Sequence, residues 1–127
     1  MRIVRDGDGD RSISYGGRFT GTVELEMLNA TPPEIDAGVD GPDTAFVHFR
    51  DGAVTFWHSH PGGQQLYVVR GEARVGTEAD GETALPTGAL VVCPADELHW
   101  HGAMPGADTT LLAITWGTTQ WTERPPV

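Results

Sequence analysis

The sequence predicts an all-β fold, an antiparallel jelly-roll β-barrel built as one domain. The 127-residue chain contains 17 glycines and nine prolines, which interrupt it too often for long helices. Short runs of alternating apolar and polar residues are separated by turn signals roughly every 8–12 residues, as in sandwiches and barrels. A chain of this length supports one hydrophobic core, whereas two cores would be marginal. We therefore expect a single domain over residues 1–127, with roughly nine to eleven short strands.

The N-terminal third contains one clear strand between two polar segments. Residues 1–17 are polar and rich in Gly and Asp, so we expect an arm or edge segment. Apolar and polar side chains alternate from Phe19 to Leu28, which is the pattern of a half-buried strand. Residues 30–43 contain several Pro, Gly and Asp residues and are predicted to form a loop.

The rest of the chain reads as a series of short strands. Asp51-Gly52 favours a tight hairpin turn between the first two of them. Turn residues also separate the later runs from one another. The predicted strands are Ala45–Arg50, Ala53–His60, Gln65–Arg70, Glu72–Gly76, Thr83–Leu85, Ala89–Cys93, Leu98–Ala103 and Thr109–Trp116.

Composition excludes several classes of function. The net charge is −10, from 18 acidic and 8 basic residues, and every basic residue is Arg. A chain without Lys has no Schiff-base or P-loop lysine. Its acidity without a basic patch argues against nucleic acid or anionic membranes as partners. No apolar run is long enough for a signal peptide or a membrane span, so we expect a cytoplasmic protein. The Lys-free, Arg-rich composition is typical of a GC-rich bacterial genome. Cys93 is the only cysteine, and we expect it to be a buried apolar residue.

The histidines indicate a metal site. All five lie between His48 and His101, and four form two His-x-His pairs. Side chains two apart point to the same face of a strand, so His58 and His60 should point together, as should His99 and His101. The first pair should share its inward face with Val54 and Phe56. Gln64 follows the turn Pro61-Gly62-Gly63 and can return to the same point. Two such pairs in a β-rich chain favour a ligand cluster.

Two segments carry a resemblance to the cupins. Residues 52–71 match the spacing of the first cupin motif, G-x5-H-x-H-x3,4-E-x6-G, with Gln64 in place of Glu. Residues 88–103 resemble the second motif, G-x5-P-x-G-x2-H-x3-N, with Asp96 for Gly and Ala103 for Asn. Asp tolerates the left-handed backbone conformation better than most residues, so the substitution at Asp96 is mild.

The resemblance implies one divalent metal ion, Mn, Zn, Fe or Ni, in a small β-barrel. The ligands carried over by the motif positions are His58, His60, Gln64 and His99. This set is neutral, so the ion would keep its full charge and act on a small-molecule substrate. The resemblance also implies a homodimer, in which Trp116 and Trp121 would help to cover open sheet edges.

A narrower resemblance concerns bacterial cupin hydroxynitrile lyases and cupin polyketide cyclases, which share the three-His, one-Gln site. The matching residues are those around Trp57–Gln64 and His99–Ala103. The sequence departs from the lyases at Leu111, where those enzymes carry a further His as catalytic base. His101 is then the best candidate for the general acid or base. His48 remains without an assigned role, and Trp57 and Trp100 should point to the opposite face of the sheet.

These observations favour a metal-dependent lyase or cyclase that uses the ion as a Lewis acid on a small oxygenated substrate. An Fe- or Ni-dependent dioxygenase is one alternative. A cupin that binds a ligand without catalysis is another.

Overall fold

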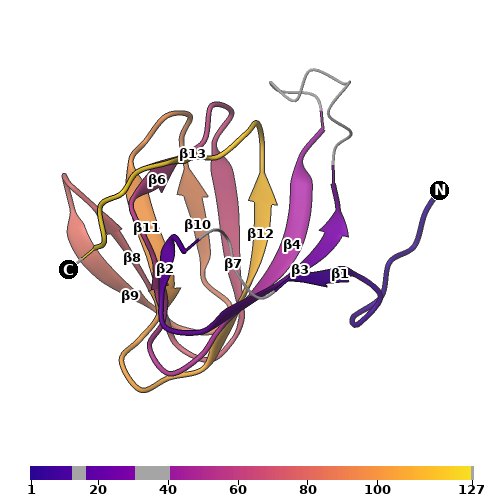
Figure 1. Ribbon diagram of the computed structural model, residues 1–127, viewed down its shortest axis with the longest axis horizontal. Coiled ribbons are helices and arrows are strands. Elements are labelled where there is room, and N and C mark those ends of the chain that lie inside the picture. The colour runs from indigo at the N-terminus through magenta and orange to yellow at the C-terminus, as the bar shows by residue number, and fades with distance from the viewer. Residues whose placement is uncertain (13–16, 31–40, 127) are drawn as a thin grey trace.

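The computed structural model of the protein describes residues 1–12, 17–30 and 41–126. Their strands form two curled antiparallel sheets, which gives the predicted all-β jelly roll (Figure 1). Parts of the expected N-terminal arm and of the loop at 30–43 lie outside the described residues. Within the described part of the chain, no helix is long and apolar enough to cross a membrane.

The first sheet is built mainly from long strands and the second from shorter ones. In spatial order, the first contains β1 (Asp10–Ser12), β3 (Val23–Asn29), β4 (Asp43–Phe49), β12 (Thr109–Thr115), β7 (Gln64–Arg70) and β10 (Leu90–Cys93). The second contains β13 (Gln120–Trp121), β6 (His58–Ser59), β11 (His99–Ala103), β5 (Val54–Thr55) and β2 (Phe19–Thr20), with β8 (Ala73–Thr77) pairing β11 and β9 (Gly81–Leu85).

The turn at Asp51-Gly52 connects the two sheets. Both residues have positive φ angles, 45° and 76°, and Ala53 N donates to Arg50 O at 3.0 Å, so a tight turn forms as expected. The predicted hairpin is nevertheless wrong, because β4 pairs with β3 and β12 whereas β5 pairs with β11 and β2. The turn passes the chain from one sheet to the other.

The segment predicted as one strand, Ala53–His60, is broken in the middle. The amides of Phe56 and Trp57 leave the ladder and donate to Arg18 O and Arg124 O, each at 2.9 Å. This break shifts the alternation of faces. Thr55 lines the internal pocket together with His58, while Val54 packs outside in a separate cluster. The expectation that Val54 shares a face with His58 was therefore wrong.

The main core lies between the two sheets. Its fully buried members include Phe49, Leu66, Val68 and Leu111. Cys93 belongs to this core, as predicted, and burial raises the pKa of its thiol to about 11, which makes it unreactive.

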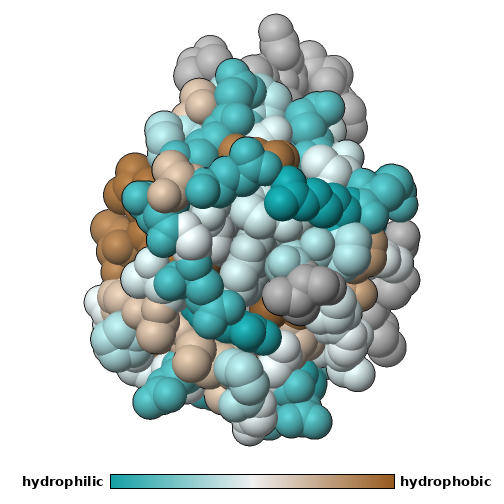
Figure 2. Space-filling model, turned by 90° about the vertical axis from the view of Figure 1, so that its left-hand side faces the viewer, coloured by the Kyte–Doolittle hydropathy of each residue, from teal (hydrophilic) through white to brown (hydrophobic). Residues whose placement is uncertain are grey.

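A smaller cluster of Val54, Trp57 and Trp100 covers the other side of the second sheet. The two indoles are stacked by guanidinium groups, Arg124 on Trp57 at 4.4 Å and Arg74 on Trp100 at 5.5 Å. These tryptophans point away from the histidines, as expected from the sequence, and they belong to a cluster that does not line the pocket. Figure 2 views the molecule from the side of β8, β9 and the C-terminal segment, where hydrophilic and pale residues cover most of the face.

Gly76 on β8 is one point where this cluster leaves no room for a side chain. It lies opposite Trp100 in the β8–β11 register, and a Cβ there would overlap the indole ring. We predict that Gly76→Ala lowers the free energy of unfolding by about 1–3 kcal/mol, since the ring must be displaced. Urea denaturation measures this loss. In the Trp100→Phe background the smaller ring leaves more room, so Gly76→Ala should cost less than it does in the wild type. An equal cost in both backgrounds would contradict the proposed overlap.

Candidate metal centre

Two histidines from the second sheet and a third just after β6 converge at one end of the barrel. His58 and His99 are direct partners across the β6–β11 ladder, and His60 follows two residues after His58. Their ring centroids are 4.5 to 5.3 Å apart. One nitrogen from each ring lies within 4.8 Å of the other two, a spacing that suits a common metal ion. All three side chains are buried.

Backbone carbonyl groups determine which ring nitrogen of His58 and His99 is available to bind a metal. His58 Nδ1 lies 2.8 Å from Phe56 O, and His99 Nδ1 lies 3.0 Å from Glu97 O. A carbonyl oxygen only accepts, so each Nδ1 must carry the hydrogen, and the Nε2 of a neutral ring is then a free lone pair. His60 Nδ1 lies 3.1 Å from Thr119 Oγ1, a hydroxyl that can either donate or accept, and its buried Nε2 has no hydrogen-bond partner among the described residues.

Gln64 adds an oxygen to this group. Its Oε1 lies 3.1 Å from His99 Nε2, and its Nε2 donates to Thr115 Oγ1 at 2.9 Å. In the tautomer set by Glu97 O, His99 Nε2 and Gln64 Oε1 are both acceptors, so two lone pairs face each other in a buried site. A cation between them removes this repulsion. The donor set therefore fits a divalent metal held by His58, His60, His99 and Gln64.

The cluster is electrostatically neutral at physiological pH. Burial, followed by the neighbouring His99, lowers the pKa of His58 well below its usual value and that of His60 to about 4. Burial also lowers the pKa of His99. Neutral imidazoles are the form that binds metals, so no proton has to be removed near pH 7.

His101 lies beside the cluster but outside the group of three. Its ring centroid is 5.1 Å from that of His58, its backbone amide donates to Thr55 Oγ1 at 3.1 Å, and its ring lines the pocket. Burial, followed by His58, lowers the pKa of His101 well below its usual value. Its Nδ1 is buried without a hydrogen-bond partner in the part of the chain that the structure describes.

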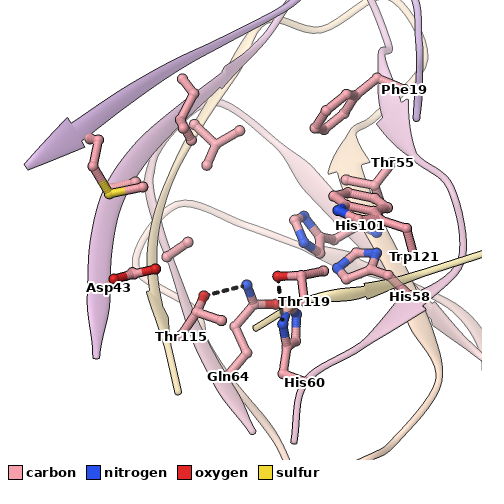
Figure 3. Close-up of a pocket in the computed structure, with 15 residues that line it drawn as sticks. Phe19, Asp43, Thr55, His58, His60, Gln64, His101, Thr115, Thr119 and Trp121 are labelled. Atoms are coloured by element: carbon pink, nitrogen blue, oxygen red, sulfur yellow. Dashed lines mark hydrogen bonds between the residues drawn. The ribbon is translucent and has the colours of Figure 1, made fainter. Parts of the chain in front are cut away.

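The pocket joins this polar end to an apolar wall (Figure 3). It encloses about 570 Å³, including solvent at its mouth. The wall comes mainly from β3, β4 and β12, and the two aromatic residues above the histidines are Phe19 and Trp121. Among the described residues that line the pocket, Asp43 is the one carboxylate, and no arginine takes part. The apolar lining residues are Phe19, Leu25, Met27, Ala45, Val47, Ala113 and Trp121.

The structure thus brings together all four ligand positions predicted from the sequence and places His101 next to them. His48 is elsewhere: it is buried with Nδ1 2.9 Å from Thr110 Oγ1 and does not line the pocket. Leu111 is fully buried in the core. Trp121 lies on β13, at the edge of the second sheet, and its ring packs on that of His58 with centroids 4.6 Å apart.

Sequence reasoning missed several residues of the site. Thr115 ends the face of β12 that also carries Leu111 and Ala113, and a polar residue in such a series was an available signal. Thr119 lies outside every predicted strand, so nothing in the local pattern indicated its contact with His60. Asp43 and Trp121 reach the pocket only through the sheet topology.

Comparison with known proteins places these features in a family context. The model of the Cupin domain family matches residues 45–115. The chain is 40% identical over 115 residues to an (R)-mandelonitrile lyase from Granulicella tundricola, covering 90% of this chain and 83% of the lyase. A cupin-like protein from Thermotoga maritima has a TM-score of 0.79 and 32% identity, over 89% of this chain and 85% of the other. The polyketide cyclase RemF from Streptomyces resistomycificus has a TM-score of 0.74 at 18% identity, over 99% and 90%, which supports the fold.

The ligand assignment predicts which substitutions remove metal. His58→Ala and His99→Ala should each abolish stoichiometric binding, because each removes a buried Nε2 donor. Gln64→Glu should keep the metal, since a carboxylate oxygen replaces the amide oxygen. Elemental analysis after dialysis against Zn²⁺ and gel filtration measures the content. His48→Ala is the matched control and should bind as the wild type does. Stoichiometric metal in His58→Ala would refute the assignment.

The buried neutral imidazoles also predict how the metal-free protein responds to acid. In the unfolded chain their pKa returns to about 6.5, so below that pH the unfolded state binds more protons than the folded state. Stability should therefore decrease as the pH falls from 7 toward 4, where His60 itself titrates. Urea midpoints in the presence of EDTA at pH 7.5, 6.5 and 5.5 measure the trend, and His60→Gln should reduce it. A midpoint independent of pH would contradict the prediction.

Proposed function

This chain belongs to the cupin family, and we propose that it is a metal-dependent enzyme that makes or breaks a carbon–carbon bond beside a carbonyl oxygen. The observation that carries the proposal is the convergence of three imidazole lone pairs and the Gln64 oxygen at the polar end of an apolar pocket. A divalent ion held by His58, His60, Gln64 and His99 would supply Lewis acidity toward a substrate carbonyl or hydroxyl oxygen.

The pocket lining favours a small neutral substrate with an apolar group. Its wall is built from aliphatic and aromatic side chains, which gain from contact with a hydrocarbon or aromatic substituent. No arginine is present among its described lining residues to pair with a carboxylate, and Asp43 would repel one. A cyanohydrin fits these requirements, and the similarity to a mandelonitrile lyase supports this class. Neutral aldehydes and enols that carry an apolar group meet the same requirements.

His101 is the residue we assign to proton transfer. It lines the pocket and is neutral because burial lowers its pKa, so its ring carries one lone pair that can accept a proton, and its Nδ1 has no hydrogen-bond partner among the described residues. In cyanohydrin cleavage, His101 would take the hydroxyl proton while the bond to the nitrile carbon breaks and its electron pair leaves on cyanide. The same proton then passes to cyanide, so that aldehyde and hydrogen cyanide are formed and the imidazole returns to its neutral state.

Apolar side chains lie around His101. Phe49 packs against its ring with centroids 5.8 Å apart, and Leu111 provides no alternative base in the neighbouring part of the core. Proton transfer through His101 distinguishes this proposal from one in which the barrel only binds a ligand. Under this proposal, turnover would depend on one imidazole that is not a metal ligand, that of His101.

The proposal predicts that the metal-loaded protein cleaves racemic mandelonitrile faster than its spontaneous decomposition. Release of benzaldehyde, followed by ultraviolet absorption, measures the rate. EDTA should abolish the activity and added Mn²⁺ or Zn²⁺ should restore it. His101→Ala should bind metal normally yet slow turnover by about 100-fold or more. His48→Ala is the control that should leave the rate unchanged.

Two results would contradict this function. Oxygen consumption with acetylacetone by the iron-loaded protein, without cyanohydrin cleavage or aldol-type ring closure, would point to dioxygenase chemistry instead. Full activity in His101→Ala would remove this histidine from the mechanism even if the metal site stands.

A further inference from the structure

The amide of Gln64 has two different orientations toward the metal site, whereas the two orientations of a carboxylate at the same position would be equivalent. A carboxylate offers two equivalent oxygens to a metal, whereas an amide offers one oxygen and one NH₂ group that does not bind metals. Rotation of the amide by half a turn would present its Nε2 to the Nε2 lone pair of His99. That hydrogen bond would satisfy the site internally and would compete with metal binding.

Thr115 opposes this rotation. It lies directly opposite Gln64 in the β7–β12 register, and its Oγ1 accepts a hydrogen bond from Gln64 Nε2 at 2.9 Å. The amide oxygen is then left 3.1 Å from His99 Nε2. Gln64 is 5% exposed, so its amide has little contact with bulk water and this hydrogen bond is strengthened. The contact therefore selects the orientation in which the oxygen faces the histidines.

A hydroxyl group both donates and accepts, so its own hydrogen must be directed away from Gln64 for this selection to work. We assign this task to the carboxylate of Asp43. It is opposite Thr115 in the β4–β12 register, both residues line the pocket, and Figure 3 shows Asp43 on the side of Thr115 away from Gln64. A carboxylate attracts the hydroxyl hydrogen toward itself, which leaves the lone pairs of Thr115 Oγ1 for the amide.

We propose that Thr115 is a positioning residue that fixes the Gln64 amide with its oxygen toward the metal, and that it thereby sets the metal affinity of the three-His, one-Gln site. The proposal rests on the metal site of the proposed function. It assigns to the end of β12 a role that a glutamate at position 64 would not require.

The test is a double-mutant cycle in the full-length protein with Zn²⁺ as the probe. Affinity is measured by competition with a chromophoric chelator, without reference to turnover. Thr115→Val removes the acceptor and should weaken Zn²⁺ binding by about 10-fold to 100-fold. Thr115→Ser keeps the hydroxyl and should stay within about 3-fold of the wild type. In the Gln64→Glu background, Thr115→Val should have little effect, because both carboxylate oxygens serve equally well.

Controls separate orientation from folding. Thr83→Val makes the same chemical change on the exposed strand β9 and should leave Zn²⁺ affinity unchanged. Thermal unfolding in EDTA checks that each variant is folded. An unchanged affinity in Thr115→Val, or an equal loss in the wild-type and Gln64→Glu backgrounds, would overturn the inference and leave the metal site standing. Failure of the wild type to bind Zn²⁺ or Mn²⁺ would overturn the proposed function along with it.

Discussion

The chemistry of this site depends on two backbone carbonyl groups. Phe56 O and Glu97 O each accept a hydrogen bond from the Nδ1 of a histidine two residues later in the chain. Because the ring is neutral, this single contact decides that Nε2 carries the lone pair. The same three-residue geometry occurs at the ends of two strands that pair with each other, so the two lone pairs are brought together by the sheet. Side chains further away then complete the arrangement.

The break at Phe56 and Trp57 makes the first of these contacts geometrically available. In a continuous strand, the Phe56 carbonyl would belong to the ladder, and the face carrying His58 would also carry Val54. The break instead releases the carbonyl for the His58 ring and turns Thr55 into the barrel, where its hydroxyl accepts the His101 amide. The irregularity of the sheet is therefore a property of the site. Its cost is offset by the bonds that Phe56 N and Trp57 N make to Arg18 O and Arg124 O.

Local patterns in the sequence predicted the strands, the two cupin motifs and the convergence of His58, His60, Gln64 and His99. These depend on period-2 alternation and on motif spacing, which are local properties. Asp96, with φ of 64°, even adopts the backbone conformation expected of the glycine it replaces. Local patterns did not predict three features: the strand break, the separation of β4 and β5 into different sheets, and the contacts of Thr115, Thr119 and Trp121. Each depends on segments far apart in the chain, such as those that carry His60 and Thr119.

The neutral donor set explains why the surroundings matter so much here. A carboxylate ligand would bind a cation through its charge in either orientation, so its neighbours would have little to decide. An amide has no net charge, and its attraction to a cation depends on the direction of its dipole. The fold must therefore control three orientations: those of the His58 and His99 rings and that of the Gln64 amide. In the described residues, each is controlled by a hydrogen bond to an atom outside the donor set: Phe56 O, Glu97 O and Thr115 Oγ1. Under the proposed role of Thr115, Gln in place of the Glu of the cupin motif makes the metal affinity depend partly on the neighbouring strand β12.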